Sequence, residues 1–388
     1  MKPFSRTLSF VVPFLLLIGA DVRGDDKPPK LFESEQMLEV TLSAPWQNIA
    51  RDERNQDPYP AAIEYGGANG ETVRHAGTVE RRGVKRQEAC DFPPIRLRFE
   101  KDEVKGSLFR GQKSLKMVTH CMKSSRYDQY YRLELLAYRM YNLVTDFSFR
   151  VRPLTVTYYD SEREKIFDTR FAFVIEDDSD LAKRNGMKKL EVAYILPNRL
   201  DDRTSSQMSL FQFMIGNVDW SALRGPDPEE CCHNVKLAAP RPFTDDDIAY
   251  PIAYDFDSSG LVDPPYAGPP PGLGINSITQ RLYRGYCHND AKAMGEVRQQ
   301  FIELKPDMLA IIEQDGMLSM RQLERIDLPA GRSVQLHPGG LHLMLLGLDR
   351  KLTPGERVPV RLRFEDGSVR EISAEVRKLQ MRKPMPHH

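Results

Sequence analysis

The sequence has no net charge, because 55 lysine and arginine residues balance 55 aspartate and glutamate residues. Proteins whose main partner is a nucleic acid or an anionic membrane usually carry an excess of basic residues. The balance gives no electrostatic support for either partner, so we expect no nucleic-acid binding. The rest of the composition, with 40% hydrophobic and 28% charged residues over 388 positions, is ordinary for a globular protein of two or three domains.

Long apolar runs are absent after residue 24. The first residues combine Lys2 and Arg6 with the run LSFVVPFLLLIGA and then small residues, an order typical of a secretory signal. A membrane anchor is the alternative, but a bilayer span needs about 20 apolar residues, more than this run supplies. We therefore expect a signal peptide over residues 1–24 and an extracytoplasmic mature protein, periplasmic or secreted, without a membrane span.

Cysteine is scarce, and the odd count of five leaves one residue without a partner. In an oxidising compartment cysteines more often form disulfides than act as catalytic thiols. We expect Cys90 to pair with Cys121, and either Cys231 or Cys232 to pair with Cys287. The alternative is a metal site made from CCHN together with the later Cys-His pair. Zinc ligands are usually spaced about two to four residues apart, which favours the disulfides.

A glycine-rich loop is also lacking, since only Gly83 stands in the basic stretch RRGVKR. From there the order of elements is clear. Strands PPIRLRFEK and KSLKMVTHC precede YDQYYRLELLAYRMYNLV, whose apolar residues recur at helical spacing, and RPLTVTYYD and TRFAFVIEDD are again typical of strands. Before them, residues 25–80 hold three weaker strands, LEVTLSA, PAAIEYG and ETVRHAGTVE.

Polar residues with metal-ligand character gather between residues 214 and 260. The stretch MIGNVDWS places Asp219 at the tip of a helix or turn, and Asn234 opens the short strand VKLAA. Asp255 and Asp257 stand two apart in IAYPIAYDFD, which we interpret as a second strand. Because alternate strand residues face the same side, both carboxylates would point at one spot. The arrangement suits a divalent cation and a polar substrate.

GNVDW, HNVKL and YDFD resemble the GN-x-D, N and D-x-D series of CotH-type secreted kinases and of HipA-like kinases, remote relatives of the protein-kinase fold. The resemblance implies an ATP- and Mg²⁺-dependent phosphotransferase with Asp219 as base. It puts Asn234 and Asp255 on the metal, assisted by Asp257. Asn234 lies 15 positions after Asp219 instead of about 5, so the inserted GPDPEECC either bulges out or makes the site non-catalytic.

The same resemblance extends to the preceding half of the chain, where a kinase needs a strand lysine for the phosphates and a helix glutamate to hold it. Lys116 and Glu134 are the candidates, with Lys113 as a substitute, and the edge around Glu176 takes the adenine-binding position. The loop YAGPPPGLG replaces an activation segment. The helices NSITQRLYRGY, DAKAMGEVRQQFIEL and PDMLAIIEQ then complete a unit over residues 81–316.

Residues 317–376 resemble the second half of a PCuAC-type periplasmic copper chaperone, a small cupredoxin-like β-sandwich. Met320, His342 and Met344 fit the last three positions of that family's metal motif, whereas its first histidine is replaced by Leu309. Imidazole and thioether ligands favour Cu(I) over zinc or magnesium. The tail at 379–388, with two methionines and two histidines, is a candidate source of the missing ligand.

The expected fold is therefore α+β, with a two-lobed kinase-like domain followed by a partial cupredoxin-like β segment. The domain layout is a signal peptide at 1–24, N-terminal strands at 25–80, a kinase-like domain at 81–316, a PCuAC-like segment at 317–378 and a Met/His tail. Three functions stay open: a phosphotransferase using Mg-ATP on a protein substrate, a Cu(I) carrier that serves a copper-accepting protein in the envelope, and a structural envelope protein. If the protein is a Cu(I) carrier, its kinase-like part is an inactive scaffold.

Overall fold

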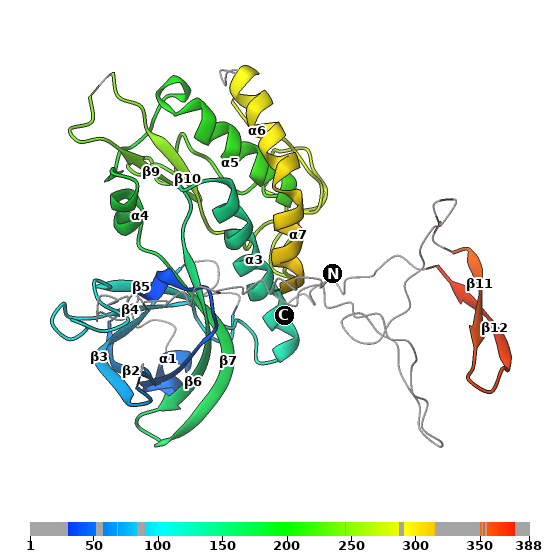
Figure 1. Cartoon of the computed structure of the whole chain (residues 1–388), viewed down its shortest axis with the longest axis horizontal. Coiled ribbons are helices and arrows are strands. Elements are labelled where there is room, and N and C mark those ends of the chain that lie inside the picture. The colour runs from blue at the N-terminus through cyan, green and yellow to red at the C-terminus, as the bar shows by residue number, and fades with distance from the viewer. Residues whose placement is uncertain are drawn as a thin grey trace, which may run out of the picture. The chain divides into compact units, whose positions relative to one another are not determined.

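The computed structural model describes residues 30–51, 57–67, 69–83, 90–244, 246–286, 291–314, 350, 352–353 and 355–376. The protein has a mixed α+β architecture with a large sheet and several helices (Figure 1). It divides into two compact units, residues 1–318 and 319–388. Within the described ranges, no helix is both long enough and apolar enough to cross a bilayer.

Seven strands of the first unit close into a barrel in the order β1-β2-β3-β4-β5-β7-β6. Neighbours are antiparallel except β1 and β6, which run parallel with Leu38 opposite Leu154 and so complete the circle. The three strands predicted before residue 80 are β1, β2 and β3, and they share this barrel with the later strands. The bounds are β1 (Leu38–Ala44), β2 (Tyr59–Gly66), β3 (Thr72–Arg81), β4 (Ile95–Arg98), β5 (Ser114–Val118), β6 (Val151–Asp160) and β7 (Lys165–Ile175), with helix α1 (Trp46–Arg51) after β1.

Apolar side chains fill the inside of the barrel. In β1 every second residue from Val40 through Leu42 to Ala44 is buried, as expected for a strand with one face on a core. Trp46 donates its indole N–H to the Leu42 carbonyl at 2.8 Å. Its ring meets Tyr158 edge-on, with centroids 5.0 Å apart. These contacts make the barrel interior a packed core.

Helix α3 (Asp128–Val144) connects the barrel to the remaining elements of the unit, and it confirms the helix predicted there. Its buried tyrosines reach across to residues far along the chain. The rings of Tyr138 and Phe256 lie 4.7 Å apart, and those of Tyr141 and Phe211 also lie 4.7 Å apart. The aromatic contacts therefore join α3 to the segments that carry Asp219 and Asp255.

The second half of the first unit combines several helices (Figure 1) with a small sheet of strand order β10-β9-β8. Helix α5 starts at the N-cap Asp201, whose carboxylate accepts a hydrogen bond from the Thr204 N–H at 2.7 Å. The helices and strands are α4 (Asp178–Arg184), β8 (Lys188–Leu190), α5 (Asp202–Ile215), β9 (Val235–Ala239), β10 (Tyr250–Ala253), α6 (Ala291–Glu303) and α7 (Lys305–Gln314), with 3-10 turns η1 (Leu31–Glu33), η2 (Ser125–Tyr127) and η3 (Pro197–Arg199).

The helix predicted for NSITQRLYRGY does not form, since residues 276–286 have irregular backbone. Two arginines of this segment explain its course. Arg281 donates to the Met214 carbonyl at 3.1 Å, and Arg284 donates to the carbonyls of Val218 and Trp220. These side-chain anchors on the α5 end and on the loop after it replace the local turn-to-turn bonds of a helix. The predicted loop YAGPPPGLG and the last two predicted helices, α6 and α7, are confirmed.

The described part of the second unit contains an antiparallel hairpin of β11 (Arg357–Arg363) and β12 (Val369–Glu375), with Arg357 opposite Glu375. The turn FEDG closes it through a hydrogen bond from the Phe364 N–H to the Ser368 carbonyl at 2.9 Å. Gly367 has a φ of 80°, a left-handed conformation that glycine adopts without a steric penalty.

Candidate functional site

The loop after α5 positions Asp219. Gly216 ends the helix with a φ of 69°, and the Asn217 side chain then accepts a hydrogen bond from the Asp219 N–H at 2.9 Å. Asn217 also forms an isolated antiparallel bridge with Ser259, which ties this loop to the later aspartate segment. The turn predicted from MIGNVDWS is thus confirmed, and the Asp219 side chain is 15% exposed.

Asn234 lies beside Asp219 in spite of the insertion between them. Ser221 and His233 form an antiparallel bridge, with N–H to O distances of 2.8 and 3.0 Å in its two directions. Residues 222–232 therefore form a loop whose two ends lie side by side at the Ser221–His233 bridge. The Asn234 amide then donates to the Asp219 carbonyl at 2.7 Å. The insertion therefore does not separate Asp219 from Asn234.

His233 was considered from the sequence only as part of the CCHN metal alternative, and its place beside Asp219 was not predicted. Its Nε2 lies 2.7 Å from Asp219 Oδ1, so the imidazole fixes the direction of this carboxylate. The signals in the sequence were its place in CCHN and its position directly before Asn234. A histidine next to an expected ligand carries no information until the Ser221 bridge has brought both residues back to Asp219.

Asp255 and Asp257 do not lie in a strand, so the predicted alternation does not apply to them. Strand β10 ends at Ala253, and Asp255 has a φ of 61°. The reason is α3, because the Asp255 N–H donates to the Tyr138 hydroxyl at 2.8 Å. Between the two aspartates, Phe256 is fully buried. Asp257 is itself nearly buried and accepts hydrogen bonds from the neighbouring Ser258 hydroxyl at 3.1 Å and from the Tyr266 hydroxyl at 3.2 Å.

Tyr254 is the point at which the barrel and the aspartate segments meet. The ammonium groups of Lys116 from β5 and Lys236 from β9 lie 5.7 and 5.3 Å from its ring centroid. Its N–H donates to the Asn234 carbonyl at 3.2 Å. Burial raises the pKa of Tyr254, the charge of Asp255 raises it further, and a nearby arginine lowers it. Cations and carboxylates therefore converge around one ring.

Burial lowers the pKa of Lys116 from 10.5 to about 8. Asp178 at the start of α4 opposes this shift, whereas the positive charges of Arg82 and Lys236 add to it. Arg82 follows β3 directly, and Gly83 after it has a φ of 77°. Three cations thus act on one another in this region, an environment that an anionic ligand such as a phosphate would relieve.

Glu134 and Lys113 occupy different settings. Glu134 is 1% exposed on α3, and its charge raises the pKa of Tyr138 after the larger effect of burial. Its ion pair with Lys116 or Lys113 stays a prediction. Lys113 is exposed and precedes β5. Because it is an odd number of residues from Lys116, an extended chain directs the two lysines to opposite faces.

One predicted disulfide is confirmed and the other is wrong. Cys90 and Cys121 are bonded, with a Cα separation of 4.5 Å. Cys231 is bonded to Cys232, so neither pairs with Cys287, which lies outside the described residues. Both sulfur atoms face the Ala222 carbonyl where the inserted loop turns back. The prediction assumed that a disulfide links distant segments and so overlooked the adjacent pair.

In the described part of the chain, no three His, Cys, Asp or Glu side chains are grouped so that they could hold a metal ion. Mg²⁺ bound to ATP needs fewer protein ligands, because it keeps several waters and takes oxygens from the phosphates. Met320, His342, Met344, His288 and the tail at 379–388 lie outside the described residues. Leu309 lies in α7.

Comparison with known proteins finds similarity in the C-terminal part of the chain. A family model described as "Putative lipoprotein LpqE-like" matches residues 302–376. A protein of Leifsonia xyli subsp. xyli (strain CTCB07), named as a putative lipoprotein, is 44% identical over 67 residues. That alignment covers 17% of this chain and 40% of the relative, so it spans less than half of the relative's length. The family match includes Met320, His342 and Met344, and begins after Asp219 and Asp255.

Proposed function

We propose that the barrel, α3 and the elements up to residue 316 form a two-lobed kinase-like unit that transfers the γ-phosphoryl group of Mg-ATP to a protein substrate. The observation that carries the proposal is the convergence at Tyr254. Lys116 and Lys236 lie over its ring, while its backbone binds Asn234 and leads into Asp255. Phosphoryl transfer depends on such placement of cations and metal ligands around the phosphates.

The residues take distinct roles in this proposal. Asp219 accepts the proton of the attacking hydroxyl as the oxygen–phosphorus bond forms and the bond to ADP breaks, and His233 holds the direction of its carboxylate. Asn234 and Asp255 contribute oxygens to Mg²⁺, and Asp257 assists. Lys116 neutralises phosphate oxygens, and Glu134 on α3 supports the lysine.

We place the activity outside the cytoplasm, in association with the cell envelope. Two features support this: the apolar run of the first 24 residues, and the similarity of residues 302–376 to proteins described as putative lipoproteins. The Cys90–Cys121 disulfide fits an oxidising compartment. A protein substrate in the envelope is the corresponding partner.

Nucleotide binding tests the proposal most directly. We expect a fluorescent ATP analogue to bind the purified chain in the presence of Mg²⁺ and at least ten-fold more weakly after its removal. Asp255→Ala should abolish this Mg²⁺ dependence, because one of the two carboxylates assigned to the ion is gone. Fluorescence anisotropy titrations with and without Mg²⁺ measure both effects.

Asp246→Ala is the matched control, since Asp246 is exposed and close in sequence but outside the group at Tyr254. It should bind like the parent. If Asp255→Ala also binds Mg-ATP like the parent, the metal assignment is wrong. If the parent binds no nucleotide, the unit is an inactive scaffold and the phosphotransferase proposal is overturned.

A second function rests on a different observation, the preserved spacing of Met320, His342 and Met344. We propose that these residues bind Cu(I) in a trigonal site, to which the Met/His tail or a copper-accepting protein adds a fourth ligand. Thioether and imidazole groups select soft copper over magnesium or calcium. The same chain would then carry a phosphotransferase unit and a copper-binding segment. A purely structural envelope role is the outcome if both tests fail.

A further inference from the structure

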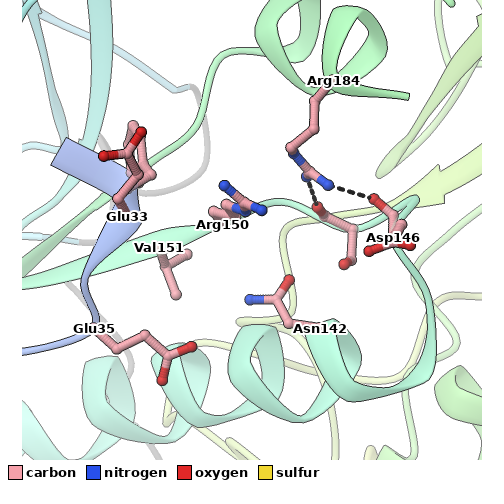
Figure 2. Close-up of a pocket in the computed structure, with 9 residues that line it drawn as sticks. Glu33, Glu35, Asn142, Asp146, Arg150, Val151 and Arg184 are labelled. Carbon is pink, nitrogen blue, oxygen red and sulfur yellow. Dashed lines mark hydrogen bonds between the residues drawn. The ribbon is translucent and has the colours of Figure 1, made fainter. Parts of the chain in front are cut away.

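A polar pocket of about 400 Å³ lies apart from the group at Tyr254 (Figure 2). It opens between the segment at η1, the end of α3, the start of β6 and the end of α4. Neither Lys116 nor any of the candidate aspartates 219, 255 and 257 lines it. Its volume falls in the range of about 300–1,000 Å³ that is typical of small-molecule sites.

The wall of this pocket is held rigidly by one arginine. Arg184 donates to the carbonyls of Asp146 and Ser148 at 3.0 and 2.9 Å. It also pairs with the nearly buried Glu176 at 3.0 Å, and Glu176 accepts the backbone N–H of Arg150 at 3.1 Å. The charge of Arg184 is therefore already neutralised within the protein. The hydrogen bonds of Arg184 and Glu176 hold the loop that carries Arg150. Arg184 therefore has a structural role in the pocket and is not a group for ligand binding.

Arg150 is the group left for a ligand, and Asn142 lies beside it in the lining. Figure 2 shows the Arg150 side chain directed into the pocket. Among the described residues, the Arg150 guanidinium has no ion pair or side-chain hydrogen bond, and Asn142 Oδ1 is buried without a hydrogen-bond partner. An unpaired buried amide oxygen is costly unless something donates to it. Because this oxygen is fully covered, it lies behind the pocket wall, and Arg150 is the group that a ligand can reach.

Acidic groups line the same pocket. Glu33 and Glu35 stand on the η1 side, and Glu33 Oε2 accepts only the Lys30 backbone N–H, at 2.7 Å, among the described residues. Glu35 lies 3.9 Å from Arg139, at the limit of an ion pair. A simple anion would be repelled by these carboxylates, and a simple cation would be repelled by Arg150. A molecule carrying both charges satisfies both sides.

We propose that this pocket binds a free α-amino acid. Its carboxylate pairs with Arg150, which can donate two parallel hydrogen bonds, and its ammonium group faces Glu33 and Glu35. Carboxylates outnumber free cations in the lining, so basic amino acids bind more tightly than neutral ones, and acidic ones bind most weakly. The proposal is independent of the phosphotransferase function.

Calorimetric titration of the full chain with L-lysine tests the proposal. L-lysinamide lacks the carboxylate and Nα-acetyl-L-lysine lacks the α-ammonium, so each should bind at least ten-fold more weakly. Arg150→Ala should weaken L-lysine binding at least ten-fold without weakening L-lysinamide binding, because the amide is a cation that the guanidinium repels. Glu35→Gln should weaken L-lysine more than Nα-acetyl-L-lysine.

Arg298→Ala is the control, because Arg298 is an exposed arginine on α6 and should have no effect. Circular dichroism of each variant checks that the fold is kept. The proposal is overturned if L-lysine shows no saturable binding at millimolar concentration, if L-lysinamide binds as tightly as L-lysine, or if Arg150→Ala binds like the parent.

Discussion

Lys116 carries its charge in a place where water solvates it poorly. Burial lowers its pKa to about 8, and Arg82 and Lys236 contribute in the same direction. A shift from 10.5 to about 8 corresponds to a destabilisation of the folded protein on the order of 3 kcal/mol while the lysine is charged. A ligand with phosphate groups would compensate for it, which agrees with the phosphate-binding role proposed for Lys116.

Lys116→Met should therefore raise the free energy of unfolding of the ligand-free protein at pH 7, by about 1–3 kcal/mol, while abolishing nucleotide binding. The sign follows from linkage. Below pH 8 both the folded and the unfolded states carry the charged lysine, so the full penalty applies. Between pH 8 and 10.5 the folded state binds fewer protons than the unfolded state, and the stability of the parent rises with pH.

Urea unfolding of parent and variant at pH 7 and at pH 10 measures this effect, and the difference between the two proteins should shrink at the higher pH. Lys113→Met is the matched control, because Lys113 is exposed and precedes the same strand. A Lys116→Met protein that is less stable than the parent at pH 7 would show that the lysine has a structural role.

At the scale of elements, the aspartate segment depends on a close backbone approach. Gly260 donates its N–H to the Gly216 carbonyl at 3.1 Å, next to the α5 end. A Cβ atom on Gly260 would lie 2.8 Å from the Ile278 carbonyl oxygen and 3.0 Å from the Thr279 Cα. Three segments therefore meet at a point where only glycine fits.

Gly260→Ala should lower the free energy of unfolding by about 1–3 kcal/mol, because backbone atoms have to move apart to make room. Since Ser259 pairs with Asn217 beside Asp219, the same change should also weaken nucleotide binding. Thermal unfolding and anisotropy titration measure the two effects. Gly268→Ala serves as the control, since no atom lies within 4 Å of its Cβ position. Equal stability of the two variants would contradict the steric argument.

The elements also show how far the sequence alone could predict this protein. Strands β1 to β7 and helix α3 could be predicted from the alternating or helical spacing of their apolar residues, which pack into the buried cores. The backbone conformation at Asp255 could not be predicted, since it depends on a hydrogen bond to the Tyr138 hydroxyl of helix α3. The same holds for residues 276–286, which Arg281 and Arg284 anchor to carbonyls elsewhere. Long-range side-chain contacts have no local periodicity.

For the candidate site, the residue types were predictable but their arrangement was not. Asp219 and Asn234 were predicted to work together, yet the bond between them depends on the Ser221–His233 bridge across the insertion. The role of Lys236 was missed, because it becomes apparent only when Tyr254 lies between it and Lys116. The polar pocket around Arg150 was also missed, since its lining comes from four separate segments.

At the scale of the whole molecule, the two compact units are expected to carry separate chemistry. Asp255→Ala should leave Cu(I) binding unchanged, whereas His342→Ala should abolish it. Affinity should also fall as pH drops below about 6.5, the usual pKa of histidine, because a protonated imidazole cannot bind the metal. Competition with a Cu(I) chelator measures these affinities. Deletion of residues 379–388 distinguishes a tail ligand, whose loss weakens binding, from an external one.

If His342→Ala binds Cu(I) as tightly as the parent, the copper proposal fails and the nucleotide experiments are unaffected. If Asp255→Ala weakens copper binding, the two units are coupled, contrary to the expectation. Each result is interpretable because the variants change residues on opposite sides of the division at residue 318.

The parallel pairing of β1 with β6 also affects when the barrel can close during synthesis. Of the described strands, β1 is made first, and β6, which comes late in the barrel sequence, holds it on one side with Ala44 opposite Asp160. Until residue 175 has emerged, the strands can assemble only as an open sheet, because β7 joins β5 to β6. Its unpaired edges are prone to pair with other chains. Ring closure over so long a loop is slow. The newly made chain therefore passes through a period in which protection by a chaperone matters most, and that period ends when β7 arrives.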